Sequence, residues 1–411
     1  MKRFRPRPVV AAALVAAASL LIPTGAGAAP EDYSGDMWFD TNGLTSTQVT
    51  ELNDGLEAAL GDVPGGVTAG LWVGNKGYWV GAVGEADIKK GAPMRPELQV
   101  PIGSVTKTLT GTIVLQQVQR GRLRLGDPMS KWFPTFPKAD QITIAMLLNM
   151  SSGIADYVNG NIARLTAQQR AHPKRRVSPG TMIWGAARMP RDFEVPGSQF
   201  AYSNTNTIIL GRILEKSTGK SYNRLLKKRI LEPLGMYRSF LDMSGDLWPR
   251  HAQTYSTMYG EIHGSPPLLR TTNWSLSMGW SAGGLASTVA DLRTWAEAMG
   301  TGQGVLKRAT HRSRSGDCVV SGTNGVLNQE YCLGVAVLRE VSSGDVVSYW
   351  HNGTMLGATS YVAYYPRTKA ILVVQSNQDA QYGPSDLTIP DQFFGAVLQE
   401  VPELLGLAYP T

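Results

Sequence analysis

Strand-forming runs lie at both ends of this 411-residue chain, and helix-forming patterns fill its middle. Near the N-terminus, residues 67–73 and 77–83 are rich in β-type residues and flank a Gly-Asn-Lys-Gly turn, which predicts a hairpin. Further runs of strand type occur in the last third, at 333–338, 346–350, 359–365 and 370–375. This order predicts one antiparallel sheet completed by both ends of the chain, with a mostly helical region inserted between them.

One segment of the middle, residues 104–120, has helical spacing and is apolar on most sides, with Gly121 placed to end it. A helix of that kind belongs in the interior of a protein. The composition allows a large core, because 43% of the residues are hydrophobic and only 17% are charged, which excludes intrinsic disorder. Other segments that we predict as helices are 47–60, 142–149, 206–217, 222–231, 288–299 and 391–405.

These patterns together predict an α/β (α+β) fold, in which helices flank an antiparallel β-sheet and an all-helical lobe is inserted. We expect a single domain over residues 29–411. Its sheet region should cover about 45–103 and 270–411, and its helical lobe about 111–269.

The first residues have the pattern of an export signal. A basic start precedes an apolar run at 9–22 and then Ala-Gly-Ala at 26–28, so we expect residues 1–28 to be a cleaved signal peptide and the product to be secreted. An uncleaved anchor helix is the alternative, and no later stretch is long enough for a membrane span. The formal charge of +7 falls to +3 without this segment, so basicity does not indicate a nucleic-acid partner. The charges lost with the segment are Lys2, Arg3, Arg5 and Arg7.

The chain has two cysteines, Cys318 and Cys332. In an exported protein we expect them to form a disulfide that closes a loop of about 15 residues and stabilises the fold by about 3 kcal/mol. Two buried free thiols are the alternative. We expect no metal or other cofactor, because there are only five histidines and none lies at ligand spacing from a cysteine.

A hydroxyl and an amine lie three residues apart at the start of the buried helix. Ser104 and Lys107 share one helix face, so their side chains can touch, and the helix N-terminus favours negative charge at that point. A lysine held there without its full water shell loses its proton more readily and can relay one for the serine. The same spacing recurs at Ser217 and Lys220, but Gly219 breaks the helix between them, so we reject this second pair.

Two further segments carry reactive groups. Tyr202 offers a phenol for proton transfer and Asn204 an amide for a substrate carbonyl, although a similar Tyr-x-Asn occurs at 157–159. His351 begins an inner strand, and Gly353 would let a substrate backbone approach closely. Each pattern is weak by itself. The ordered combination, with the tyrosine 98 and the histidine 247 residues after the serine, is much more specific.

In that combination the chain resembles the serine penicillin-recognising superfamily, in the branch that holds class C β-lactamases, secreted DD-carboxypeptidases and related esterases. The resemblance covers about residues 45–380. It implies an antiparallel sheet with flanking helices and an all-helical lobe, and a site in the cleft between them. The segments that carry it are Ile102–Thr108, Leu147–Gly153, Tyr202–Asn206, Ser281–Gly284 and His351–Thr354.

The resemblance also implies roles for these residues. Ser104 would be the acylated nucleophile, Lys107 its proton partner, and Tyr202 the general base, with its phenol shifted toward the anion by nearby positive charge. Asn204 would orient the substrate amide. The reaction would be a two-step acyl transfer through an ester on the serine.

The third segment departs from the β-lactamase pattern. His351 stands where those enzymes have lysine, Gly353 is retained, and the backbone N–H of Thr354 would form an oxyanion hole with that of the nucleophile. Secreted DD-carboxypeptidases of this type read a carboxylate with two strand hydroxyls and an arginine. Here Asn352 replaces one hydroxyl, and Ala336 occupies the position of the arginine.

Arg339 is available nearby, but it lies an odd number of residues from that position, so in an unbroken strand it faces the opposite side. We predict a D-alanyl-D-alanine carboxypeptidase whose partner is a peptide or small acyl substrate, such as a peptidoglycan stem peptide. An esterase or amidase of the same fold is the alternative. A β-lactamase or an inactive binding protein is less favoured. The sequence gives no indication of the oligomeric state.

Overall fold

The structure is a computed structural model that describes residues 37–158, 162–245, 247, 250–257, 268–380 and 387–407. The signal peptide expected at residues 1–28 lies outside these ranges. Within them, no helix has both the length and the apolar character that crossing a membrane requires.

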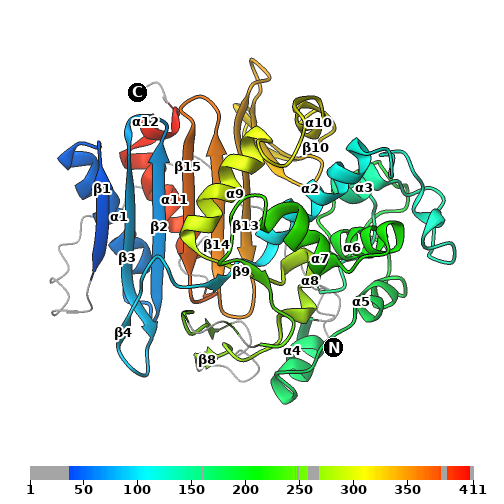
Figure 1. Cartoon of the computed structure of the whole chain (residues 1–411), viewed down its shortest axis with the longest axis horizontal. Coiled ribbons are helices and arrows are strands. Elements are labelled where there is room, and N and C mark those ends of the chain that lie inside the picture. Colours follow the sequence, from blue (N-terminus) through cyan, green and yellow to red (C-terminus); the bar gives the residue numbers. More distant parts are fainter. Residues whose placement is uncertain are drawn as a thin grey trace, which may run out of the picture.

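A large antiparallel sheet forms one half of the molecule (Figure 1). The two ends of the chain meet at its centre, where β2 and β15 pair from Val73↔Ala370 to Val67↔Ser376. The predicted sheet completed by both ends is therefore confirmed. In spatial order its strands are β1 (Trp38–Asn42), β3 (Gly77–Asp87), β2 (Gly66–Val73), β15 (Ala370–Ser376), β14 (Thr359–Tyr365), β13 (Val346–Thr354), β12 (Ala336–Glu340), β11 (Leu327–Tyr331) and β10 (Val319–Thr323), with β4 (Ala92–Pro93) paired to β3.

Helices cover both faces of the sheet. On one face, α1 (Ser46–Leu60), α11 (Ile389–Glu400) and α12 (Pro402–Leu405) enclose an apolar core with the strands. On the other face, α9 (Val289–Thr301) lies across β13, β14, β15 and β2. The short strands outside the large sheet are β5 (Val100–Pro101), β6 (Phe240–Leu241) and β9 (Leu285–Ser287), which pair together, and β7 (Tyr255–Ser256) with β8 (Leu269–Arg270).

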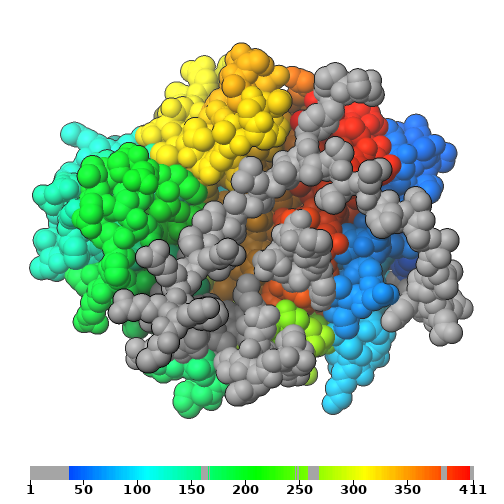
Figure 2. All heavy atoms as spheres, turned by 180° about the vertical axis from the view of Figure 1, so that it is seen from behind, coloured from blue at the N-terminus to red at the C-terminus, as the bar shows by residue number. Residues whose placement is uncertain are grey.

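The middle of the chain builds a helical lobe beside the sheet. Seen from the opposite side, cyan and green residues from the middle of the chain form one flank and the blue and red ends the other (Figure 2). The remaining helices are α2 (Thr106–Gln119), α3 (Ile144–Leu148), α4 (Ile162–Ala171), α5 (Pro179–Ala186), α6 (Asn204–Thr218), α7 (Tyr222–Leu226) with a π-turn (Lys227–Leu231), α8 (Trp280–Gly283) and α10 (Arg308–Arg314).

Several predicted boundaries are wrong, among them that of β3, which continues to Asp87 and does not end at 83. β12 begins at Ala336 and not at 333, because the chain turns before it, with the Cys332 N–H bonded to the Val335 carbonyl at 2.8 Å. β13 continues to Thr354, so His351 lies inside the strand and does not open it. The last helix is divided, since α12 starts at Pro402, which cannot continue the hydrogen-bonding of α11.

Helix α2 connects the sheet to the lobe, and it is buried around most of its circumference, as its sequence predicts. Its polar side chains find partners in the surrounding core. Thr108 accepts the Trp295 indole N–H at 2.8 Å, and Thr110 donates to the Ser281 carbonyl at 2.6 Å. A helix fixed on all sides holds the residues at its N-terminus in one place, which suits a catalytic position.

Candidate active site

Ser104 and Lys107 contact each other at the N-terminus of α2. Ser104 lies in a 3₁₀ turn, η1 (Gly103–Val105), that leads directly into the helix. The Lys107 ammonium nitrogen is 2.7 Å from the serine Oγ and 2.9 Å from the Ala282 carbonyl oxygen. The structure thus brings together the hydroxyl and the amine that the sequence pattern pairs.

Lys107 is almost completely buried, with only 1% of its surface exposed. Burial lowers the pKa of its amine to about 7, and the negative charge of Asp156 opposes part of that shift. An amine with this pKa is partly unprotonated at neutral pH. It can therefore accept the proton of the adjacent Ser104 hydroxyl.

Tyr202 also lies beside Ser104, just before α6. Its side chain hydrogen-bonds Ser104, and the Lys107 nitrogen is 5.0 Å from the centre of its ring. Burial raises the pKa of the Tyr202 phenol well above its ordinary value, and the bond to Ser104 and the nearby Asp156 have smaller effects. This shift is opposite to the expected one. The neutral phenol, and not the phenolate, is the resting form.

Asn204 is turned toward a residue that the sequence analysis missed. Its amide nitrogen donates to Asp156 Oδ2 at 2.7 Å. Asp156 is 4% exposed and also accepts the Val158 N–H at 3.0 Å; its burial raises the pKa of the carboxyl group. The signal that could have found it is an acidic residue three positions after Gly153, where the Leu147–Gly153 segment ends.

His351 is fixed through both of its ring nitrogens. Nδ1 lies 2.6 Å from the Asn352 carbonyl oxygen, which can only accept, so Nδ1 carries the hydrogen. Burial and the charge of Lys107 lower the pKa of the ring to about 3, so the ring is neutral. Nε2 is then an acceptor, and the Tyr331 hydroxyl donates to it across 3.0 Å. His351 consequently has neither a charge nor a spare ring N–H to offer.

The end of β13 presents the backbone N–H of Thr354 to the same place. Met355 and Ala358 exchange both of their backbone hydrogen bonds, so the next pair, Thr354 and Thr359, is of the kind that is not hydrogen-bonded. The N–H of Thr354 therefore points away from β14. The pairing of β12 with β13 ends at Trp350, which leaves room on that side of the strand.

The η1 turn fills this space, and two glycines allow it to approach. A methyl group on Gly103 would lie 2.5 Å from the Thr354 nitrogen. One on Gly353 would lie 2.0 Å from the Ile102 carbonyl oxygen and 2.9 Å from the Ser104 nitrogen. The backbone nitrogens of Ser104 and Thr354 are thus close to each other, and an oxyanion hole needs two such donors.

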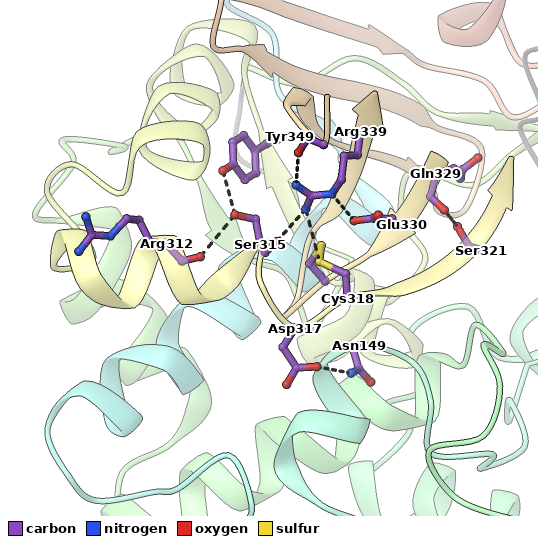
Figure 3. Close-up of a disulfide and its surroundings, with 12 residues drawn as sticks. Asn149, Arg312, Ser315, Asp317, Cys318, Ser321, Gln329, Glu330, Arg339 and Tyr349 are labelled. Atoms are coloured by element: carbon purple, nitrogen blue, oxygen red, sulfur yellow. Dashed lines mark hydrogen bonds and ion pairs between the residues drawn. A yellow bond between two sulfur atoms is a disulfide. The ribbon is translucent and has the colours of Figure 1, made fainter. Parts of the chain in front are cut away.

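Arg339, on β12, is bonded to groups other than the residues described above (Figure 3). Its guanidinium donates to Glu330 Oε2 at 2.9 Å and to the carbonyl oxygens of Ser315 at 2.7 Å and Gly344 at 2.9 Å. These bonds use its fork of donors. The structure therefore does not place this cation among the site residues.

The disulfide between Cys318 and Cys332 is formed, which confirms the predicted pairing against two free thiols (Figure 3). Glu330 is the third member of the single His, Cys, Asp and Glu grouping of metal-site size in the described ranges. Both sulfur atoms of that grouping are joined to each other, so they are not free to act as thiolate ligands.

Comparison with known proteins agrees with this geometry. The family model named Beta-lactamase matches residues 53–390. The chain belongs to the Beta-lactamase family. Protein flp of Staphylococcus aureus strain N315 is 28% identical to this chain over 353 residues, which cover 83% of this chain and 65% of protein flp. The chain thus spans slightly less than two thirds of that protein's length.

Solved structures of other proteins have a similar fold. A D-stereospecific amidohydrolase from Streptomyces sp. superimposes with a TM-score of 0.72 at 24% identity, covering 86% of this chain and 98% of the other. D-amino acid amidase from Ochrobactrum anthropi SV3 gives a TM-score of 0.71 at 23% identity, with the same coverage. The predicted fold class is therefore confirmed, and the chain has the fold of a family of serine hydrolases.

Proposed function

We propose that this protein is a serine amidohydrolase that forms an acyl-enzyme on Ser104 and acts on amides of D-amino acids or short D-peptides. The observation that carries the choice of substrate is the state of His351, which is neutral and bonded through both ring nitrogens. β-Lactams and peptides ending in D-Ala-D-Ala carry a carboxylate, and a cation binds a carboxylate more strongly than a neutral donor does. An amide substrate needs no such group.

Two residues stand near the positions where relatives have a cation, and neither supports binding of a carboxylate. His351 is uncharged, and Arg339 is bonded to Glu330 and to two backbone carbonyls. The carboxypeptidase prediction thus loses support relative to the amidase alternative. The names of the two similar solved structures, a D-stereospecific amidohydrolase and a D-amino acid amidase, give the same direction.

In the first step, the neutral Lys107 amine takes the Ser104 proton while Oγ forms a bond to the substrate carbonyl carbon. The two backbone N–H groups of Ser104 and Thr354 hold the resulting oxyanion. The Tyr202 phenol then gives its proton to the leaving nitrogen and recovers one from the Lys107 ammonium, as the C–N bond breaks. In the second step, water attacks the ester, its proton passes to the same pair of side chains, and Ser104 regains its hydrogen.

The test compares kcat/KM for D-phenylalanine amide with that for a peptide ending in D-Ala-D-Ala, with nitrocefin and a p-nitrophenyl ester as further substrates. We expect the amide to be preferred over the carboxylate-ended peptide by at least about tenfold, the scale of one lost charged contact. Faster hydrolysis of the peptide would restore the carboxypeptidase assignment. Rapid nitrocefin turnover would support a β-lactamase, and ester cleavage without amide cleavage an esterase.

We further propose that the protein acts outside the cytosol. The disulfide supports this, because such bonds persist in oxidising compartments. The test is the N-terminal sequence of protein recovered from the culture medium, which should begin at Ala29. Retention of the intact N-terminus inside the cell would contradict it.

A further inference from the structure

We propose that Tyr331 is a positioning residue of this site, which holds His351 and Tyr202 in place and is itself anchored by the Cys318–Cys332 disulfide. The inference rests on the proposed function, because it concerns what aligns the groups that carry out that reaction. No sequence pattern assigned Tyr331 a role. It begins the run Tyr-Cys-Leu-Gly at 331–334.

Tyr331 touches two site residues at once. It is the last residue of β11 and is buried, and its hydroxyl is 3.0 Å from His351 Nε2. Its ring meets the His351 ring edge-on, with centres 5.7 Å apart, and the Tyr202 ring at 6.0 Å. On its outer side it packs against Phe200, at 6.2 Å between ring centres. A shift of this ring would therefore move both the histidine and the phenol.

The hydroxyl also stabilises the form of His351 that carries its hydrogen on Nδ1. Because it donates to Nε2, that nitrogen stays an acceptor and Nδ1–H stays on the Asn352 carbonyl. Without the hydroxyl, Nε2 would be a buried acceptor with no donor in the wild-type geometry, an arrangement that is costly. The ring could then turn or change its tautomer, and the wall of the site beside Gly353 would no longer be fixed.

The segment that follows Tyr331 is fastened at several points (Figure 3). Cys332 forms the disulfide with Cys318. Asp317, which precedes Cys318, accepts a hydrogen bond from the Asn149 amide at 3.1 Å, and this bond joins the disulfide region to the helical lobe. The N–H of Leu333 bonds to the Arg314 carbonyl at 3.1 Å. These fastenings restrain the chain one and two residues after Tyr331, and so restrain the tyrosine itself.

The decisive variant is Tyr331→Phe, which removes the hydroxyl and keeps the ring. Its matched control is Tyr349→Phe, on the neighbouring part of the sheet, where the hydroxyl bonds to Ser315 Oγ at 3.2 Å instead (Figure 3). We expect kcat/KM for D-phenylalanine amide to fall about tenfold in the first and less than about twofold in the second, as for one lost hydrogen bond. Equal effects in both variants would overturn the proposal.

A double-mutant cycle separates positioning through the histidine from a general effect on packing. With His351→Ala as background, Tyr331→Phe should lower kcat/KM by less than about twofold, since its target is gone. Full additivity would contradict the inference. Nitrogen NMR of the labelled histidine gives a readout independent of turnover. We expect the Nδ1–H tautomer in the wild type and a mixture of tautomers in Tyr331→Phe, and an unchanged spectrum would count against the proposal.

The anchor is tested by reducing the disulfide in the folded protein and by the paired change of Cys318 and Cys332 to serine. Both should broaden the His351 signal and lower kcat/KM about threefold. An unchanged signal in both would refute the anchoring role. If the wild type cleaves no amide at all, the proposed function fails, whereas the tautomer measurement still decides whether Tyr331 positions the histidine.

Discussion

The chain contains two Ser-x-x-Lys segments, and they differ in the burial of the lysine and in its contact with the serine. At the start of α2, Lys107 is buried and lies 2.7 Å from Ser104. At the end of α6, Ser217 bonds to the Leu214 carbonyl at 3.3 Å, and Lys220 is exposed. Gly219 ends that helix in the left-handed conformation, with φ of 67°, as the sequence predicted.

The comparison shows that the pattern alone supplies no chemistry. Both segments have the same residue types at the same spacing, but only the first is covered on all sides. The Lys220 side chain is exposed to water. Burial removes that water from Lys107, lowers the pKa of its amine to about 7 and leaves Ser104 as its neighbour.

Replacing the serine of each segment by alanine should give the largest difference in activity between the two segments. Ser104→Ala should lower amide turnover by at least about a thousandfold, because the acyl intermediate can no longer form. Ser217→Ala should keep wild-type turnover, since its hydroxyl bonds only to its own helix. Steady-state rates and a mass-spectrometric search for the acyl-enzyme provide the measurement. Substantial activity in Ser104→Ala would refute the assignment of the nucleophile.

Lysine to arginine sharpens the comparison, because it keeps the charge and removes the ability to accept a proton. Lys107→Arg should reduce kcat about a hundredfold or more, the usual range for losing a general base. Lys220→Arg should have no effect on kcat. Thermal unfolding of both variants controls for damage to the fold. A Lys107→Arg enzyme that folds and turns over normally would exclude the lysine as the base.

A glycine directly before the first segment and a glycine inside the second allow a third comparison. Gly103 has φ of 49°, and a methyl group there would lie 2.5 Å from the Thr354 nitrogen. Gly103→Ala should push η1 away from β13 and lower kcat about a hundredfold, as small misplacements in active sites do. Gly219 has no atom within 4 Å of the added group, so Gly219→Ala should only destabilise the fold, by about 1 kcal/mol. Chemical denaturation and kcat, measured on both, distinguish the outcomes.

Much of the fold was predictable because strand and helix periods are local. The pairing of β2 with β15 follows from apolar strand runs at both ends, and α2 from a run that is apolar on most sides. The break at Pro402 has a local cause, whereas two other boundary errors arise from long-range contacts. The turn before Ala336 depends on the disulfide corner, and the extension of β13 to Thr354 depends on its pairing with β14.

The site was predictable in its members but not in its electrostatics. The pattern correctly grouped Ser104, Lys107 and Tyr202, yet the predicted direction of the tyrosine's pKa shift was wrong, because burial raises this pKa by more than the bond to Ser104 lowers it. Asp156 was missed since a single carboxylate after a loop has no periodic signature. Its importance comes from its place beside Lys107 in the folded chain, and its one local sign is its position three residues after Gly153.

The pH dependence of kcat/KM should report the buried lysine directly. The pKa of Lys107 is lowered to about 7, so below that pH the amine is protonated and kcat/KM should fall about tenfold per unit. Histidines ordinarily titrate in this range, but the pKa of His351 is lowered to about 3, so it stays neutral there and His351→Asn should keep the same acidic limb. Asp156→Asn should move the midpoint to lower pH, because the carboxylate charge that favours the Lys107 ammonium is then gone. A flat profile from pH 5 to 8 would show that Lys107 is not the base.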